Sequence, residues 1–467
     1  MVRLTFPRYD PFSPPMTRRR ADDLTLDRVR EMLAAHAVTR IYMKALAPND
    51  NSKNQPYFGG DFGVLNILPA GKPVAGRTDG ARSKPIFKAP LNFWWLGGDG
   101  TIRPAPNAKL ILYPQYPEVR FSGYLLGVDA AHRPSEVLGT TRVDGRFLLV
   151  GVCESGRIVG LAAGPESRLA RELRGLRDLE QVGVFSLVPI SDSPARGGSR
   201  AIVLAELCRI SALGWISSRR LDKHGETLAC AAPNCGGYTL EAELGITPNG
   251  YAEPDFHGWE IKQHGVRNFA KPQDSPITLM TPEPSDGFYV SAGVLKFLEK
   301  YGYPDTSGRA NRLNFGGIFR RGALDARTEL RLELLGYDHA KGTVVDATGG
   351  IALIDRRDNE AAVWRYSDML GHWSRKHAFA VYVPSVSREA DGRQYRFGAT
   401  VRMGSGTSFE RLLSALHDGD VYYDPGIKVE GYPAKPRTKR RSQFRIRSSR
   451  IGRLYEKMEG VEVCRGT

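Results

Sequence analysis

The sequence predicts a protein of the α/β (α+β) class with a mostly β first half and a mixed second half, and three observations support this prediction. The chain has 467 residues, about three times the most common length of a domain. The first half contains short β-rich runs between turn residues, whereas the second half mixes helical and strand patterns. A stretch rich in Ser, Gly and Pro at 191–200 separates the two halves. We therefore expect an irregular arm over 1–21, a β-rich domain over 22–195 and a second domain over 200–467.

The elements of the first half follow from hydrophobic periodicity. Residues 24–34 have the apolar spacing of a short helix, and residues 40–46 have that of a strand. Four further predicted strands lie between turn residues, at 62–67, 110–113, 121–126 and 147–152. The first half is therefore expected to form a β barrel or a β sandwich.

The second half is predicted to open with a helix over 201–213. A second helix is well defined, because Phe409, Leu412, Leu413 and Leu416 recur at helical spacing. A capping box that begins at Thr407 precedes this helix, and Gly419 follows it. Predicted strands lie around Glu260 and at 378–383 and 421–423, which gives this half its mixed character.

Composition excludes several classes of protein. The chain is 41% hydrophobic and 25% charged, as expected of a folded globular protein rather than a disordered one. It has no long apolar run and a polar amino terminus, so neither a membrane span nor a signal peptide is expected. No Walker-type phosphate loop is present, which argues against ATP-driven action.

The cysteines are few and odd in number. Five cysteines in a chain of this length argue against a secreted disulfide scaffold. We therefore expect a protein of the reducing cytoplasm. Cys230 and Cys235 lie between His224 and His257, but their spacing departs from the usual CxxC pairs, so a zinc site is disfavoured.

The charge favours a polyanionic partner. The net charge is +15, which raises the expectation of nucleic acid binding. Much of the excess lies beyond Lys435. There, Phe444 and Ile446 have strand spacing, so Arg445 and Arg447 would share the opposite face. An ordered basic strand is predicted, and the alternative is a solvated basic terminus without a partner.

Three residues with the chemistry of phosphodiester hydrolysis lie close together in the second half. If 259–263 is a strand, Glu260 and Lys262 point to one face, because strand side chains alternate. A turn at His257 and Gly258 can bring Asp255 beside Glu260. Such a carboxylate pair provides the hard oxygen ligands that Mg²⁺ prefers. The metal would activate the attacking water, and Lys262 would orient or deprotonate it.

The same pattern has a plainer interpretation. A Glu and a Lys two residues apart also occur as a surface ion pair on an exposed strand. Glu241 can strengthen the catalytic interpretation, because it lies on a predicted short helix that Thr239 can cap and Gly245 can end. The alternative for Glu241 is a solvent-facing helix residue.

These motifs carry a resemblance to a known family. Residues 239–246 read TLEAELGI and 254–262 read PDFHGWEIK, and further motifs lie at 373–384 and 409–428. Together they resemble the MvaI/BcnI-type restriction endonucleases and, more distantly, the MutH mismatch-repair nickase, both of the PD-(D/E)xK fold. The resemblance implies that Asp255 and Glu260 bind Mg²⁺, that Lys262 assists the nucleophilic water, and that Glu241 is a further catalytic carboxylate.

The resemblance also implies DNA-contacting residues in the second half. The segment 436–445 is similar to the family's major-groove reading segment, in which arginines can grip guanine. The candidates for base contacts are Arg437, Lys439, Arg440, Arg441 and Arg445. Arg375, Lys376 and His377 are candidates for phosphate contacts, although a lone His before an apolar strand is more often structural.

The first half carries a shorter resemblance. Residues 40–55 read RIYMKALAPNDNSKNQ and resemble the start of the amino-terminal effector domain of EcoRII-type enzymes, a DNA-binding β pseudobarrel. The residues that would contact DNA are Lys44, Asn49, Asn51, Lys53 and Gln55. The alternative is an ordinary Asn-rich turn that its own side chains stabilise.

The expected function is therefore a sequence-specific, Mg²⁺-dependent type II restriction endonuclease that cuts double-stranded DNA. A cognate DNA methyltransferase encoded nearby would be its partner, and its oligomeric state is open. The Asp-x4-Glu spacing is more similar to that of the restriction enzymes than to that of the nickase. A strand-nicking repair enzyme and an inactive DNA-binding regulator are the two alternatives.

Overall fold

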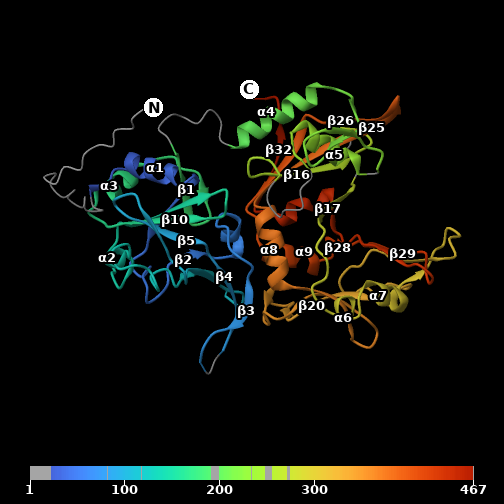
Figure 1. Ribbon diagram of the computed structural model, residues 1–467, viewed down its shortest axis with the longest axis horizontal. Helices are drawn as coiled ribbons and strands as arrows, with labels where there is room; N and C mark the ends of the chain where they lie inside the picture. The colour runs from blue at the N-terminus through green and yellow to red at the C-terminus, as the bar shows by residue number, and fades with distance from the viewer. Residues whose placement is uncertain are drawn as a thin grey trace, which may run out of the picture.

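The computed structural model describes residues 23–80, 83–116, 118–190, 199–232, 234–247, 255–270 and 274–465. The predicted arm over 1–21 lies outside the described residues, as does most of the predicted linker. The described chain forms two lobes, the first built from residues before 191 and the second from residues after 198 (Figure 1). Both lobes are rich in strands, and the helices are short, so the predicted α/β class is confirmed.

Two sheets form the first lobe. The larger has the strand order β11 (Gln181–Val182), β12 (Phe185–Val188), β1 (Val38–Leu46), β9 (Arg146–Cys153), β10 (Ile158–Ala163), β5 (Phe93–Leu96) and β6 (Ile102–Pro104). The smaller has the order β2 (Tyr57–Gly59), β8 (Glu118–Ser122), β7 (Lys109–Tyr113), β4 (Pro85–Pro90) and β3 (Val74–Arg77). Buried aromatic residues from both sheets, including Phe58, Phe121 and Phe185, join in one apolar cluster. The lobe therefore has the layered core that its alternating sequence predicts.

Two helices cover the other face of the larger sheet. The predicted first helix is present as α1 (Leu26–Ala35), and Thr25 caps it by accepting from Arg28 N. It packs with α3 (Arg168–Gly175) in a separate apolar cluster that includes Val29 and Leu173. A short helix, α2 (Ser135–Leu138), lies in the loop before β9.

Two strand predictions in the first lobe are wrong. Residues 62–67 form a 3-10 helix, η2 (Phe62–Asn66), because Asp61 accepts from Gly63 N and begins a helical turn. The predicted strand at 121–126 ends at Ser122. Gly123 follows with φ +70°, and a side chain there would collide with the backbone of Asn107.

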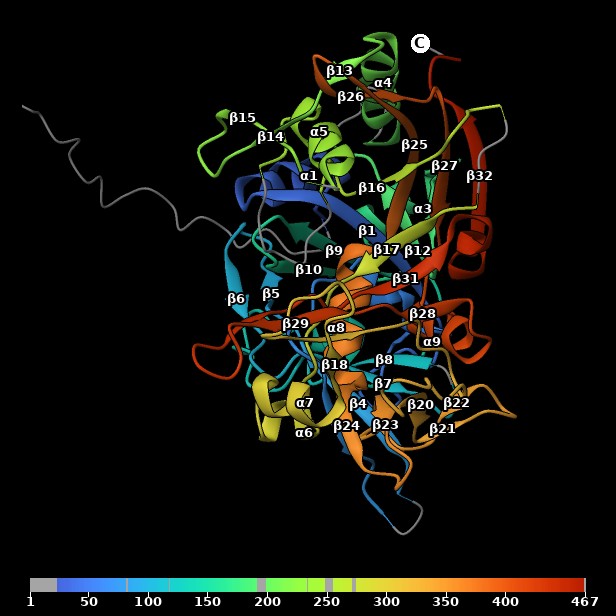
Figure 2. The ribbon, with the colours of Figure 1, turned by 90° about the vertical axis from the view of Figure 1, so that its right-hand side faces the viewer.

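The main sheet of the second lobe positions the candidate site. Its order is β13 (Ile216–Ser217), β26 (Gly392–Phe397), β25 (Phe379–Ala390), β27 (Thr400–Ser405) and β32 (Lys457–Glu462), and β16 (Glu260–Gly265) pairs with β25 in parallel. Figure 2 shows β25, β27 and β32 side by side. Helices α4 (Ser199–Ala212) and α5 (Cys235–Glu243) share an apolar cluster with one face of this sheet through residues such as Val203, Leu240 and Val381.

Smaller sheets complete the second lobe. One has the order β17 (Pro276–Met280), β31 (Phe444–Arg447), β28 (Val421–Tyr423), and another β18 (Tyr303–Pro304), β19 (Arg312–Gly316), β29 (Gly426–Glu430), β30 (Arg437–Lys439). A third has the order β20 (Arg331–Leu335), β23 (Gly350–Ile354), β24 (Glu360–Arg365). Two hairpins pair β14 (Arg219–Leu221) with β15 (Thr227–Ala229), and β21 (Tyr337–Asp338) with β22 (Thr343–Val344). The remaining helices are α6 (Phe288–Ser291), α7 (Val294–Tyr301), α8 (Tyr366–Lys376), α9 (Phe409–His417) and η3 (Ser448–Leu454).

Helix α9 has the predicted apolar face but not the predicted cap. Phe409, Leu412 and Leu416 are buried. Ser408 caps the helix, because its hydroxyl accepts from Arg411 N. Thr407 instead accepts a hydrogen bond from Trp373 Nε1 and donates one to Leu454 O. The N-cap therefore lies one residue later than the sequence predicts, and the predicted capping box is absent because Arg411 follows Ser408 by three residues.

Two cysteine pairs that the sequence did not predict are bonded in the described structure. Cys208 is bonded to Cys464, with 5.1 Å between their Cα atoms, and Cys230 is bonded to Cys235, with 5.8 Å. The first pair is 256 residues apart in sequence, so only the packing of α4 beside the end of β32 brings it together. Cys153 is free and buried. None of the described helices combines the length and the apolar character needed to cross a bilayer.

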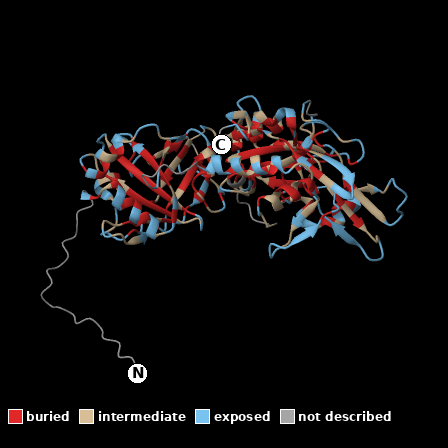
Figure 3. Cartoon of the chain, turned by 90° about the horizontal axis from the view of Figure 1, so that it is seen from above, coloured by how far each residue is buried: buried red, intermediate tan, exposed pale blue. Residues whose placement is uncertain are grey.

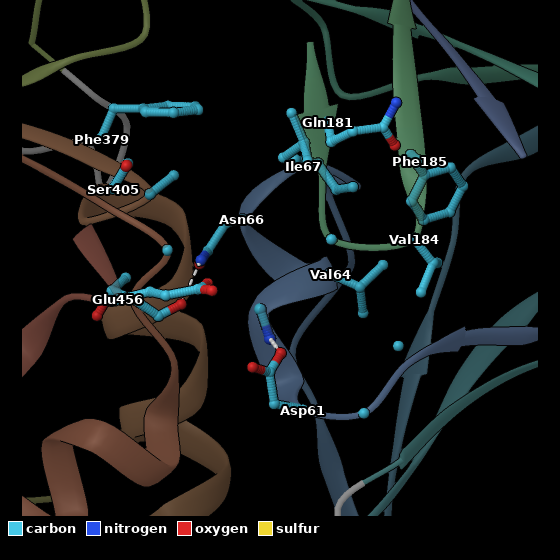
Figure 4. Close-up of a pocket in the computed structure, with 18 of the residues that line it drawn as sticks. Asp61, Val64, Asn66, Ile67, Gln181, Val184, Phe185, Phe379, Ser405 and Glu456 are labelled. Atoms are coloured by element: carbon cyan, nitrogen blue, oxygen red, sulfur yellow. Dashed lines mark hydrogen bonds between the residues drawn. The ribbon is translucent and has the colours of Figure 1, made fainter. Parts of the chain in front are cut away.

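The two lobes meet at η2. This helix packs against α8 and α9, and Asn66 Nδ2 donates to Thr407 O at 2.8 Å. A cavity of about 400 Å³ lies beside this contact. Figure 4 shows Asp61, Val64 and Asn66 on one side of it and residues of the second lobe, such as Glu456, on the other. Buried residues concentrate in the strands and helices of both lobes (Figure 3).

Candidate active site

The site begins with a tight turn before β16. Phe256 and Trp259 pair across it, with N to O distances of 3.0 and 2.8 Å. The two residues between them, His257 and Gly258, have φ values of +46° and +83°, as a two-residue hairpin turn of this kind requires. The turn folds Asp255 back, so that its Oδ2 accepts from Ile261 N at 3.0 Å. Asp255 therefore lies beside the start of β16.

The charged residues of β16 share one face, and their neighbours in the sequence share the other. Lys262 Nζ lies 2.5 Å from Glu260 Oε1. Trp259 and Ile261 belong to the apolar cluster under the sheet. The side chain of Glu260 is fully buried, and that of Lys262 is 19% exposed. A surface ion pair on an exposed strand is therefore excluded by this burial.

Three carboxylates act on Lys262. Burial alone would lower the pKa of Lys262, but the charges of Glu260, Asp255 and Glu241 outweigh it, so the pKa of Lys262 lies above its usual value. Glu241 comes from α5 rather than from β16. The structure thus brings together the four residues that the sequence singled out, around one ammonium group.

Helix α5 differs in part from the prediction. It begins at Cys235, four residues before Thr239, so Thr239 is not its cap. The buried Thr239 hydroxyl donates to Cys235 O at 2.7 Å and accepts from Arg219 N at 3.2 Å. Gly245 follows the helix with φ +72°, as expected of a residue that ends a helix. Thr239 therefore fixes α5 to the neighbouring hairpin, and the position of Glu241 depends on this contact.

The carboxylates suit a hard divalent cation. Asp255 and Glu260 provide oxygen donors side by side in an apolar surrounding, where carboxylates persist only with a cation nearby. Mg²⁺ is usually bound by one or two carboxylates together with water and substrate phosphate. Within the described ranges, no group of three or more His, Cys, Asp or Glu side chains is arranged to hold an ion. The fit therefore rests on the pair Asp255 and Glu260.

The basic segment of the second lobe has an exposed and a packed part. The exposed side chains that the sequence proposed for DNA are those of Arg437, Lys439, Arg440 and Arg441. Phe444 and Ile446 are buried in β31. Arg445 points away from them, and its Nη1 lies 2.5 Å from Asp424 Oδ2. The alternation predicted for this strand is present.

The second proposed group, Arg375, Lys376 and His377, is described only in part. The side chains of Arg375 and Lys376 lie outside the described residues. The ring of His377 is fully buried and stacks on Trp373, with 4.2 Å between the ring centroids. His377 therefore lies in the interior of the lobe and not at a surface that DNA could touch directly.

The polar loop of the first lobe is largely occupied by its own contacts. Lys44 and Asp50 form a buried ion pair at 2.9 Å. Asn51 is buried, and its Oδ1 accepts from Lys53 N and Asn54 N. This is the self-stabilised turn that the sequence left as an alternative. The predicted DNA contacts of Lys44 and Asn51 stay a prediction, and the structure does not support them because both side chains are engaged within the loop.

Other residues of this loop remain accessible. The side chains of Asn49 and Lys53 are exposed, whereas Gln55 Nε2 donates to Ser122 Oγ at 3.1 Å.

Sequence reasoning missed Arg146, which is fully buried and donates to the backbone carbonyls of Asp50, Ala47, Pro48, Val137 and Val143. No periodicity in the sequence identifies such a residue.

Sequence reasoning also missed neighbours of the site on the main sheet. His264 lies on the same face of β16 as Glu260 and Lys262, and its position in the alternation was a usable signal. Tyr382 pairs with Lys262 across the strands and shares a hydrogen bond with Tyr455 at 2.9 Å. Burial and this contact raise the pKa of Tyr455 well above its usual value, and the Glu260 charge contributes.

Comparisons with known proteins bear on the second lobe. The family model of the MvaI/BcnI restriction endonuclease family matches residues 204–455, more than half of the chain. This match confirms the resemblance that the motifs indicated. It does not reach the first lobe, whose likeness to a pseudobarrel stays a prediction.

Solved structures give more distant likenesses. The complex of restriction endonuclease MvaI with its cognate DNA substrate has a TM-score of 0.43 and 16% identity, and the likeness covers 57% of this chain and 99% of that one. The structure of MvaI in the absence of DNA has a TM-score of 0.33 and 16% identity, with the same coverage. No curated protein matches the chain.

Proposed function

The chain belongs to the MvaI/BcnI restriction endonuclease family, and from this premise we propose that it cuts double-stranded DNA at a specific sequence by Mg²⁺-dependent hydrolysis at β16. Membership of the family makes it a site-specific type II deoxyribonuclease. One observation carries the assignment of the site: within the matched segment, a fully buried Glu260 contacts Lys262 beside Asp255.

The proposed roles follow from the contacts of each side chain. Asp255 and Glu260 would hold the cation, which when bound lowers the pKa of the attacking water and stabilises charge on the phosphate. Lys262, whose Nζ lies 2.5 Å from Glu260 Oε1, would orient or deprotonate the attacking water. Glu241, on α5, would add a third negative charge near Lys262.

DNA recognition is proposed for the exposed basic residues around β30. The side chains of Arg440 and Arg441 are exposed. Guanidinium groups bind guanine through two hydrogen bonds. The first lobe would add contacts from Asn49 and Lys53. A cognate DNA methyltransferase would protect the same sequence in the host.

The test is digestion of unmodified plasmid and phage DNA by the purified chain with Mg²⁺ or with EDTA. Discrete fragments that require Mg²⁺ are expected, and sequencing of their ends gives the site. Nicked circles as the end product would favour the repair-type nickase. Intact DNA in every lane, together with salt-sensitive binding, would favour the inactive regulator and overturn the proposal.

A further inference from the structure

A cavity of about 570 Å³ lies on the same face of the main sheet as Glu260 and Lys262. Its floor is formed by neighbouring strands. His264 follows Lys262 by two residues on β16, Tyr382 pairs with Lys262 from β25, and Arg402 pairs with Tyr382 from β27. Residues paired in this way project from one face of a sheet. The cavity is therefore an extension of the candidate active site along β16.

Arg402 brings a positive charge to the cavity without a matching carboxylate. Its Nη1 donates to Ser448 O at 2.7 Å. Burial lowers the pKa of Arg402, and the opposing influence comes from Tyr382. In the part of the chain that the structure describes, no Asp or Glu forms an ion pair with Arg402. Because a partly buried guanidinium without an anion is costly, the cavity is suited to an anionic ligand.

His264 adds a hydrogen-bonding group to the same cavity. Its side chain is 8% exposed, and its Nδ1 has no hydrogen-bond partner. Burial, followed by the charge of Arg402, lowers the pKa of His264 to about 4. The ring is therefore neutral at neutral pH and offers one N–H donor. A buried polar atom without a partner calls for an explanation, and a ligand provides one.

The acidic residue of the cavity does not oppose an anion strongly. Asp274 accepts from Ser449 N at 3.0 Å and from Ser448 Oγ at 3.3 Å. Although burial acts in the other direction, these hydrogen bonds and Arg447 keep the pKa of Asp274 below its usual value. Its charge is thus already compensated by its neighbours. Apolar walls come from Phe269 and Phe397, which lower the local polarity and strengthen a charged contact.

We propose that this cavity is a phosphate-binding subsite, in which Arg402 and His264 hold the DNA phosphate next to the scissile one. This inference rests on the proposed function. Two residues along a strand span roughly 7 Å, so a phosphate at His264 and one at Lys262 lie about one nucleotide step apart. A free phosphate, as in inorganic phosphate or a nucleotide, has the same chemistry and is the other source to be distinguished.

The first arm of the test removes one phosphate charge at a time. Duplexes that contain the mapped cut site carry a single neutral methylphosphonate at each position around the scissile bond. In the wild-type protein, replacement of the neighbouring phosphate is expected to slow single-turnover cleavage or weaken binding about tenfold or more, as for a lost charged hydrogen bond. In Arg402→Met the same replacement is expected to have an effect below about threefold, because the pair is already broken.

Two further variants control this arm. His264→Gln keeps the size of the side chain and is expected to reduce the same coupling, and it serves where Arg402→Met fails to fold by circular dichroism. Arg393→Ala is the matched control, because Arg393 lies on β26 of the same sheet but pairs with the exposed Glu389. It is expected to show the wild-type pattern at every position.

The second arm uses inorganic phosphate and deoxyadenosine monophosphate, with thermal unfolding as the readout. Coupling to one neighbouring phosphate in the first arm supports the DNA strand as the source. Stabilisation by free phosphate that Arg402→Met abolishes, without any coupling to DNA, overturns the DNA assignment. If neither coupling to a DNA phosphate nor stabilisation by free phosphate is observed, the proposed subsite is overturned. Failure of the wild type to cut unmodified duplex would instead contradict the proposed function, and the second arm would still test the cavity.

Discussion

Two polar segments, residues 44–55 in the first lobe and 435–447 in the second, were both predicted to contact DNA, but their side chains are placed differently. In the first, Lys44, Asp50 and Asn51 are directed inward and bind each other or the local backbone. In the second, Arg437 and Arg441 are exposed, and the apolar residues of β31 anchor the segment. A polar loop therefore does not identify a binding surface by composition alone. The presence of a separate apolar anchor is the more informative feature.

The largest expected effect on stability tests the inward-directed loop. Arg146→Met removes a buried guanidinium that donates to five backbone carbonyls. We expect the unfolding free energy of the first lobe to fall by about 3–5 kcal/mol, measured by denaturant titration. Arg142→Ala, at a nearby exposed position, is the control. An unchanged midpoint in Arg146→Met would mean that the loop does not depend on this residue.

The next effect concerns the junction between the lobes. Burial raises the pKa of Glu410 to about 7, with a further contribution from Asp61 of the first lobe. The folded protein therefore binds this proton more tightly than the unfolded chain. Stability from this group is full below the unfolded pKa near 4.5 and falls as pH rises to about 7.

Glu410→Gln removes this pH dependence. Relative to the variant, the wild-type unfolding free energy is expected to fall by on the order of 1–3 kcal/mol between pH 5 and pH 8. Thermal or denaturant unfolding at several pH values measures it, and Glu329→Gln at an exposed position is the control. Parallel curves for Glu410→Gln and the wild type would show that Glu410 does not titrate in this range.

A third prediction compares the DNA contacts of the two segments. Arg441→Ala is expected to weaken specific DNA binding by about 1–3 kcal/mol if it reads a base. Lys53→Ala should lower affinity less and mainly reduce its salt dependence. Fluorescence anisotropy at several salt concentrations measures both. Loss of specificity in Lys53→Ala but not in Arg441→Ala would reverse the roles assigned to the two segments.

The smallest effect tests the self-stabilised turn. Asn51→Ala removes the acceptor of two backbone N–H groups, so we expect a loss of about 1–2 kcal/mol in stability. DNA affinity should be unchanged, because Asn51 is buried. Asn49→Ala, at an exposed position, controls for the loop. A weaker affinity in Asn51→Ala without a loss of stability would support the contact that the sequence proposed.

Alternation along strands was the most reliable signal in the sequence. It predicted the shared face of Glu260 and Lys262 and the buried Phe444 and Ile446, because a period of two needs no tertiary information. Helix periodicity likewise identified α1 and α9. The match of the family to residues 204–455 covers the region in which these local patterns were clearest.

The features that the sequence did not reveal depend on distant neighbours. The bond between Cys208 and Cys464 joins positions 256 residues apart, and no spacing rule predicts it. η2 was predicted as a strand because its apolar residues are dense and the capping role of Asp61 was overlooked. Arg402 joins His264 only through pairing across three strands, so its place beside the site required the structure.

The most direct test of the central claim is single-turnover cleavage by Lys262→Ala, measured beside DNA affinity. Lys296→Ala, which removes an exposed lysine that pairs with Glu299, is the matched control. If the site on β16 is catalytic, Lys262→Ala should cut DNA at least about a thousandfold more slowly than the wild type. Its DNA affinity should stay within about threefold of wild type. Cleavage by Lys262→Ala at the rate of the control would contradict it and place the chemistry elsewhere in the chain.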